Sequence, residues 1–222
     1  MATNRLQPAN HAADGRDVLA ELDTMLATSG ATGHAYVTAL ARAATVRRET
    51  VADIAHLLAL LHGNRPSVFE IVGQSPLAPC PQWLQAATRS FAREREKIAQ
   101  LVLAAGPPPA RAGQTSVEMS VSATRNALAT VAGSDRLGCA IGASAALLLD
   151  WDAISAVLGR LGQAVGMELA PRHGEWPGRE ASIAALEMAI SLPGGDRAVR
   201  FGFQALLGQH HDFWTIAESR AG

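Results

Sequence analysis

The feature that most constrains the fold is a long apolar segment, residues 134–169, whose interior holds five glycines. Each glycine inside a helix costs about 0.5–1 kcal/mol relative to alanine, so close packing has to restore that free energy. We therefore expect either a neighbouring helix or a flat ligand to lie directly against this backbone. The sequence leaves both options open. The glycines are Gly138, Gly142, Gly159, Gly162 and Gly166.

The rest of the composition favours an all-α protein. Hydrophobic residues make up 48% of the 222 residues and aromatic residues only 5%, and no segment alternates polar and apolar residues as a strand does. We expect a multi-helical bundle of about seven helices around the central Gly/Ala-rich helix. Residues 14–222 are expected to form one helical-bundle domain, and residues 1–13 a disordered tail.

Apolar spacing places the individual helices. The helix over 34–62 is expected to bend near Thr45, and Thr115 with Glu118 is typical of a capping box. The charged run Phe91–Lys97 alternates in sign, which favours a solvated, salt-bridged face. The expected helices span residues 14–28, 34–62, 66–72, 82–105, 115–133, 134–169, 180–192 and 196–218.

Charge and targeting signals narrow the partners. A formal net charge of −1 gives no electrostatic reason to expect nucleic acid. The uncharged run 137–149 is shorter than the ~20 residues of a membrane span, and the N-terminus lacks a secretory signal, so we expect a cytoplasmic protein. Cys80 and Cys139 predict neither a disulfide nor a zinc site. Trp83 and Trp176 are candidates for a surface that binds a protein partner or forms a homodimer.

Familiar catalytic motifs are absent from the sequence, including HExxH, GxSxG, the P-loop and paired Glu-x-x-His. Glu49, Asp53 and His56 share one side of a helix, where they could together ligate a metal. They point away from the apolar stripe, so we interpret them as a solvated polar face and predict no metal site.

Three histidines have distinct interpretations. His210 lies on the apolar stripe of the last helix, which predicts a core histidine with one hydrogen-bond partner or, alternatively, a ligand. His62 lies in the last turn of its helix, where a positive charge interacts favourably with the helix dipole. His34 lies near a helix start and should stay neutral.

Residues 131–142, Val-Ala-Gly-Ser-Asp-Arg-Leu-Gly-Cys-Ala-Ile-Gly, resemble the distal-helix segment of bacterial haem oxygenases. In that family small residues let the backbone lie against one face of the haem. The resemblance implies a helical fold with Gly138 and Gly142 over a haem. It departs from the family in one extra residue, Asp135, and in the absence of a histidine just before Leu22-Asp23.

If haem or a metal binds, the resemblance leaves His210 or His34 as the ligand, and Arg136 or Arg125 as the partner of the cofactor carboxylates.

Three functions remain open from the sequence. The first is a cytoplasmic helical-bundle binding or interaction protein without a recognisable catalytic motif. The second is a haem- or metal-dependent oxygenase-like protein. The third is a carrier of an apolar small molecule held between the Gly-rich helix and the last helix, whose aromatic walls would be Phe201, Phe203, Phe213 and Trp214.

Overall fold

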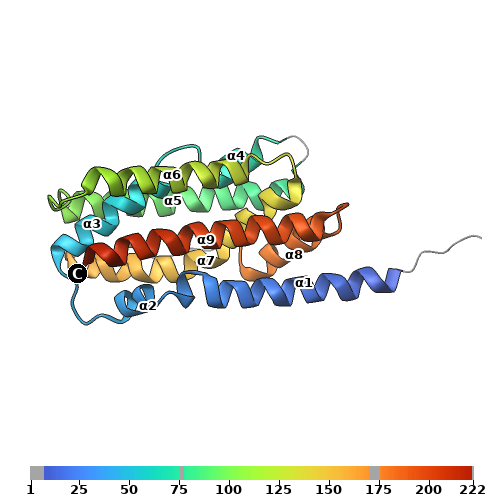
Figure 1. Cartoon of the computed structure of the whole chain (residues 1–222), viewed down its shortest axis with the longest axis horizontal. Helices are drawn as coiled ribbons and strands as arrows, with labels where there is room; N and C mark the ends of the chain where they lie inside the picture. Colours follow the sequence, from blue (N-terminus) through green and yellow to red (C-terminus); the bar gives the residue numbers. More distant parts are fainter. Residues whose placement is uncertain (1–7, 76–77, 171–175, 222) are drawn as a thin grey trace, which may run out of the picture.

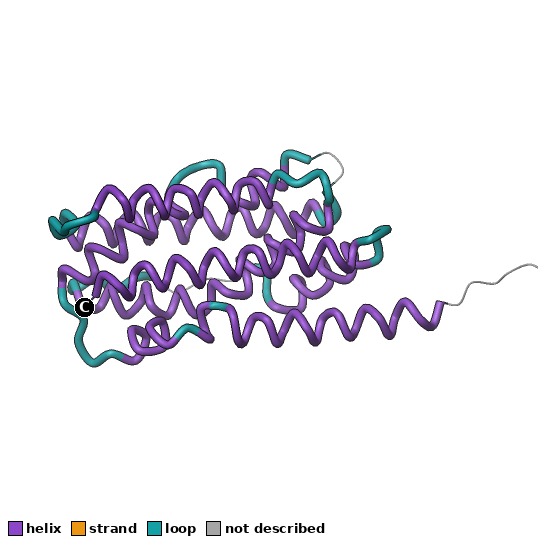
Figure 2. Tube along the Cα trace, viewed as in Figure 1, coloured by secondary structure: helices purple, strands orange, loops and turns teal. Residues whose placement is uncertain are grey.

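The computed structural model describes residues 8–75, 78–170 and 176–221, without the side chains of residues 8–14 and 137. Throughout these ranges the regular structure is helical and no strand occurs (Figure 2). The prediction of an all-α multi-helical bundle is therefore confirmed.

The elements follow one another with short connections. A 3₁₀ turn, η1, precedes α2, and a π-helical turn, η2, continues α3. Their bounds are α1 (Pro8–Ser29), η1 (Ala31–Gly33), α2 (Ala35–Arg42), α3 (Arg48–Leu58), η2 (Ala59–Gly63), α4 (Val68–Gly73), α5 (Pro81–Ala105), α6 (Gln114–Ala132), α7 (Leu137–Ala164), α8 (Arg179–Ile190) and α9 (Gly195–Ala221).

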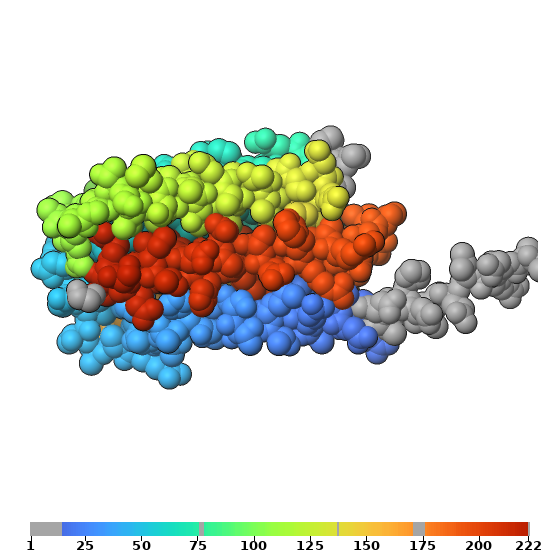
Figure 3. Space-filling model, viewed as in Figure 1, coloured from blue at the N-terminus to red at the C-terminus, as the bar shows by residue number. Residues whose placement is uncertain are grey.

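The long helices run roughly along the longest axis of the molecule (Figure 1). On the face shown in Figure 3, α9 lies between α6 on one side and α1 on the other. The most extensive contact in the fold joins α7 to α9. α7 is the central helix that the sequence predicts, because nearly all of its described side chains in the first four turns are buried.

The expectation of close packing is wrong for Gly159 and Gly166, which meet no atom within 4 Å, and Gly162 meets Met167 and Leu169 of the following loop. The body that lies against the other two glycines, Gly138 and Gly142, is a neighbouring helix. A Cβ added to Gly142 would overlap the carbonyl of Val199 on α9, and one added to Gly138 would lie 3.0 Å from the Cβ of Ala198. The contact is reciprocal, because a Cβ on Gly202 of α9 would overlap the carbonyl of Cys139. The missing side chains therefore let two helix backbones touch, which offsets the cost of glycine.

Several helix ends differ from the prediction. α1 begins at Pro8, before the expected start at 14, and residues 1–7 lie outside the described residues. The expected helix over 34–62 is interrupted between Arg42 and Arg48. α7 stops at Ala164 instead of continuing to 169, because Gly166 adopts a φ of 74° that ends the helix.

The predicted capping box is wrong in position. The N-cap of α6 is Gly113, which has no side chain to cap the helix, so Thr115 and Glu118 already lie inside it. The capping box that the structure contains belongs to α4, where Ser67 and Glu70 bond each other's backbone N–H groups.

Gly138–Ala164 is long and apolar enough to cross a membrane by length and composition alone, but 72% of its apolar window is buried inside the protein. A buried core helix passes the same test, so this helix is weak evidence for a span and is compatible with a soluble protein.

Candidate functional site

Three buried side chains form a hydrogen-bonded chain through the core. Nδ1 of His210, on α9, lies 2.6 Å from Oδ2 of Asp150, on α7. Nε2 of His210 lies 3.2 Å from Nε2 of His62, on η2. Asp150 and His210 are at most 1% exposed and His62 is 6% exposed. Because buried ionisable groups are costly unless paired, we treat Asp150–His210–His62 as the candidate site and call it the buried relay.

The backbone at the start of η1 holds the Asp150 carboxylate in place. The Ala31 N–H donates to Oδ1 of Asp150 at 2.6 Å, while Oδ2 accepts from His210. Gly30 makes this approach possible, because a Cβ there would lie 2.6 Å from the same carboxylate oxygen. Both carboxylate oxygens therefore have fixed partners, and the His210 ring is oriented by a group that cannot rotate.

A widened turn of helix positions His62. Its ring packs edge-on against Trp151, at a centroid distance of 5.2 Å, and against Phe91, at 5.8 Å. Burial, and then the neighbouring His210, hold the pKa of His62 well below its ordinary value. His62 is therefore neutral at pH 7, and its predicted favourable interaction as a cation with the helix C-terminus is wrong.

A second buried polar group supports Trp151. The indole Nε1–H donates to Oε2 of Glu94 at 2.9 Å, and Nζ of Lys97 donates to Oε1 of the same carboxylate at 2.6 Å. Glu94 is 1% exposed and Lys97 is 9% exposed. The prediction of a solvated face for the charged run is therefore wrong at these two positions, which face the core and fix the ring beside His62.

His62 also forms part of the wall of a small cavity of about 140 Å³, which we call the His62 cavity. Among its lining residues, His62, Phe91 and Leu128 are buried, whereas Asn64 and Asn126 are exposed. The remaining lining residues are Leu61, Pro66, Ser67, Val68, Ile71, Arg125 and Ala129.

The relay links this cavity to the Asp150 carboxylate through two proton positions. When His210 is neutral, its Nε2 accepts from the Nε2–H of His62, and Nδ1 of His62 is a base. A carboxylate that fixes the tautomer and orientation of an imidazole in this way is a recurring device of catalytic and binding sites.

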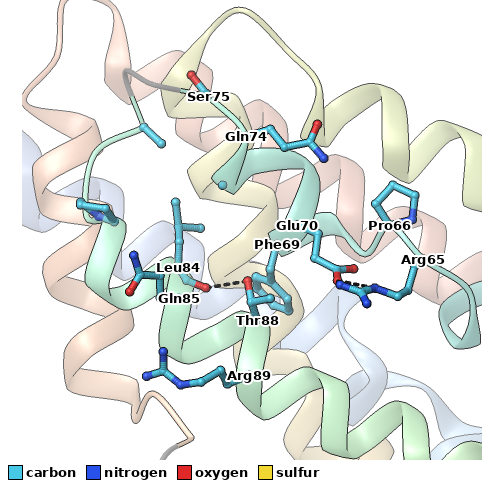
Figure 4. A pocket seen from close by; sticks show the side chains of 13 residues that line it. Arg65, Pro66, Phe69, Glu70, Gln74, Ser75, Leu84, Gln85, Thr88 and Arg89 are labelled. Atoms are coloured by element: carbon cyan, nitrogen blue, oxygen red, sulfur yellow. Dashed lines mark hydrogen bonds and ion pairs between the residues drawn. The ribbon is translucent and has the colours of Figure 1, made fainter.

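A larger groove, of about 980 Å³, is lined by residues of α4, of α5 and of the segments that precede them (Figure 4). Its carboxylate, Glu70, is joined to Arg65 at one edge of the groove, while Thr88 and Arg89 come from α5 (Figure 4). The groove has no contact with the buried relay, so its chemistry is that of an ordinary polar surface.

The other histidine that the sequence singles out lies elsewhere. Nδ1 of His34 accepts from the Tyr36 N–H at 3.3 Å and caps α2, and its Nε2 lies 3.3 Å from Oγ1 of Thr215. Burial, and then the nearby His211, lower the pKa of His34, as expected for a neutral ring. His34 therefore has a structural capping role and does not join the relay.

The residues that the resemblance assigns to haem do not fit a haem site in this structure. The backbone of α9 occupies the space in front of Gly138 and Gly142 where the ring would lie. Arg136 is exposed at the start of α7, and His34 and His210 take part in separate hydrogen-bond groups. None of these five residues lines the His62 cavity or the groove, whereas Arg125, the alternative partner of the cofactor carboxylates, lines the His62 cavity.

The polar face of α3 is solvated only in part, because Glu49 is exposed whereas Asp53 and His56 have partners within the protein. Asp53 is buried and accepts two hydrogen bonds from the guanidinium of Arg220, at 2.6 and 2.7 Å. His56 bonds the carbonyl of Gly106 at 3.0 Å. In the part of the chain that the structure describes, no group of three potential metal ligands comes together.

Two apolar surfaces that the sequence predicts are not found in the structure. Phe201 is 64% exposed, so it does not wall a cavity between α7 and α9, and those two helices are in direct contact. Trp83 is buried and therefore does not mark an interface. The other predicted aromatic walls, Phe203, Phe213 and Trp214, belong to the core.

Sequence reasoning recognised His210 as a core histidine, but it expected one hydrogen-bond partner where the structure has two, Asp150 and His62, and it missed the importance of both. One signal was available for Asp150, because this carboxylate directly follows the apolar run 137–149. A buried acid needs a partner, and the histidine on the apolar stripe of the last helix is such a partner. No local pattern identified His62, whose position depends on the π-helical turn.

The comparisons with known proteins identify a family without assigning an activity. The model of one family, described as a family of unknown function (DUF6975), matches residues 26–222. No curated protein and no solved structure matches the chain.

Proposed function

The chain belongs to this family of unknown function, DUF6975, and we propose from the site alone that the protein binds a small organic molecule in the His62 cavity. The observation that carries the proposal is that one ring, His62, both lines a cavity and ends a buried hydrogen-bonded relay. Binding sites combine apolar walls with a few fixed polar groups, and the His62 cavity has this composition.

The size of the cavity limits the ligand. An engineered cavity of about 150 Å³ holds one benzene molecule, so the His62 cavity of about 140 Å³ holds a molecule of similar size. The function is therefore binding of a compact molecule of about six non-hydrogen atoms. A drug-sized ligand or a haem is too large for it.

The relay gives the cavity a pre-organised polar group. Asp150 fixes the ring of His210, and His210 in turn fixes which nitrogen of His62 carries the proton. A ligand that hydrogen-bonds to His62 therefore meets a ring that is already oriented, which reduces the entropy lost on binding.

The test uses isobutyramide, a neutral probe of suitable size, and follows the ring resonances of His62 by NMR. The resonances are assigned by their loss in the His62→Gln variant. We expect saturable shifts in the unsubstituted protein, with a Kd in the roughly micromolar-to-millimolar range allowed for so small a ligand.

A variant that fills the cavity is compared with a matched variant at an exposed position. Ala129 lines the cavity and Ala123 is exposed on the same helix, α6. Ala129→Phe should abolish the shifts, whereas Ala123→Phe should preserve them. Unchanged shifts in Ala129→Phe, or no shifts at His62 in the unsubstituted protein, would contradict binding in this cavity.

A further inference from the structure

This inference depends on the proposed function and concerns the charge of the ligand, which the residues that line the His62 cavity indicate. The only charged residue among those that line the cavity is Arg125, and none of them is an acid. Arg125 would repel a cationic ligand and attract an anionic one.

Arg125 itself has no ion-pair partner in the described part of the chain, although it is half-buried on α6. Other arginines near buried or partly buried acids are paired, as Arg95 is with Glu70 and Arg220 with Asp53. A guanidinium presents a planar set of donors that matches a carboxylate, so Arg125 is a ready-made anion partner.

The apolar walls select among anions. Most of the uncharged lining side chains are apolar and offer no hydrogen bonds, while Asn64, Ser67 and Asn126 add neutral polar groups. The larger apolar ones are Leu61, Val68, Ile71, Phe91 and Leu128. Inorganic phosphate would have to lose its hydration against these residues, whereas an alkyl carboxylate has an apolar part that gains by burial.

We propose that the ligand of the His62 cavity is a small monocarboxylate, with its carboxylate paired to Arg125 and its alkyl part against Phe91 and Leu128. The Nε2–H of His62 is donated to His210, so its free Nδ1 can only accept, and Arg125 is the polar partner of the carboxylate. The class of ligand thus follows from one unpaired cation and from the apolar side chains that line the same cavity.

Isobutyrate and isobutyramide test this proposal, because they have the same shape and differ in charge at pH 7. Both are titrated into the protein while the His62 ring resonances are followed by NMR, and inorganic phosphate is titrated separately. We expect isobutyrate to bind at least about tenfold more tightly than isobutyramide, as a charged hydrogen bond requires. Phosphate should cause no saturable shift.

Arg125→Gln should bring the two affinities to within about twofold of each other, since only the charged interaction is removed. The matched control is Arg89→Gln, at an exposed arginine of the groove on α5, which should retain the preference for isobutyrate. Thermal unfolding of both variants checks that they are folded.

Equal binding of the two probes in the unsubstituted protein, or an undiminished preference in Arg125→Gln, would overturn the monocarboxylate proposal and leave binding in the cavity intact. Tighter binding of phosphate than of isobutyrate would also overturn it. Failure of both organic probes to shift His62 would instead contradict the proposed function itself.

Discussion

Glu70 joins three parts of the fold through one carboxylate. It accepts the Ser67 N–H at 2.7 Å at the start of α4, and it pairs with Arg65 and, at 3.1 Å, with Arg95 of α5. Burial alone would raise the pKa of Glu70, but the Ser67 hydrogen bond and the two arginines together lower it to about 2. The ionised form of this side chain therefore stabilises the folded state.

We expect Glu70→Gln to lower the free energy of unfolding at pH 7 by about 1–3 kcal/mol, the range for hydrogen bonds to charged groups. The folded pKa lies below the unfolded value of 4.5, so the stabilisation is present above pH 4.5 and is lost as the pH falls towards 2. Urea unfolding of both proteins from pH 7 to pH 3 measures the difference.

The control for this prediction is Glu187→Gln, at an exposed glutamate of α8, which should change stability by less than about 0.5 kcal/mol. The difference in free energy of unfolding between the unsubstituted protein and Glu70→Gln should shrink as the pH falls. A constant difference would show that the carboxylate charge does not stabilise the fold.

Individual residues also show where sequence reasoning stops. His210 could be placed in the core because its helix repeats apolar residues at regular spacing. Glu94 and Lys97 could not be placed in the core from the sequence. A run of alternating charges has the same pattern whether its ion pair faces solvent or a tryptophan from another helix. His62 shares this difficulty, since its partners come from α5, α7 and α9.

At the scale of elements, the α7–α9 contact predicts opposite effects for two glycines of one helix. Gly142→Ala would place a methyl group on the Val199 carbonyl, so we expect a loss of about 1–3 kcal/mol or more by overpacking. Gly159→Ala meets no atom within 4 Å and should instead stabilise the protein by up to about 1 kcal/mol. Chemical denaturation of both variants gives the comparison.

Similar changes in the two variants would mean that helix propensity, rather than the close contact of α7 with α9, decides the role of these glycines. Gly202→Ala and Gly208→Ala repeat the experiment on α9, where a methyl group overlaps the Cys139 carbonyl in the first case and meets open space in the second.

The elements were the most predictable level of this structure. Apolar periodicity located α5, α8 and α9 to within a few residues, because a face buried along its whole length leaves a regular pattern. The break before α3 and the π-helical turn η2 were less predictable, since each depends on contacts with distant segments. The sequence left two options for the body that contacts the glycines of α7, a neighbouring helix or a flat ligand, and only the packed structure distinguishes them.

The whole molecule is tied together by contacts between distant parts of the sequence. Ala31 and Asp150 are 119 residues apart, and His62 and His210 are 148 residues apart. Because this polar chain crosses one continuous hydrophobic core, loosening any one segment removes partners from all the others.

We therefore expect the protein to unfold as a single cooperative unit. Fluorescence of the fully buried Trp151 and Trp214 should report the same urea midpoint as the far-ultraviolet circular dichroism of the helices. Two separate transitions would show that residues 14–222 contain more than one independently stable domain.

The π-helical turn at Ala59–Gly63 has a consequence for how the site arose. A π-helical turn has the geometry of an α-helix that has gained one extra residue. Each residue rotates an α-helix by about 100°, so removing that residue would swing the imidazole of His62 away from His210. Deleting one residue of this turn is therefore expected to separate the cavity from the interior carboxylate.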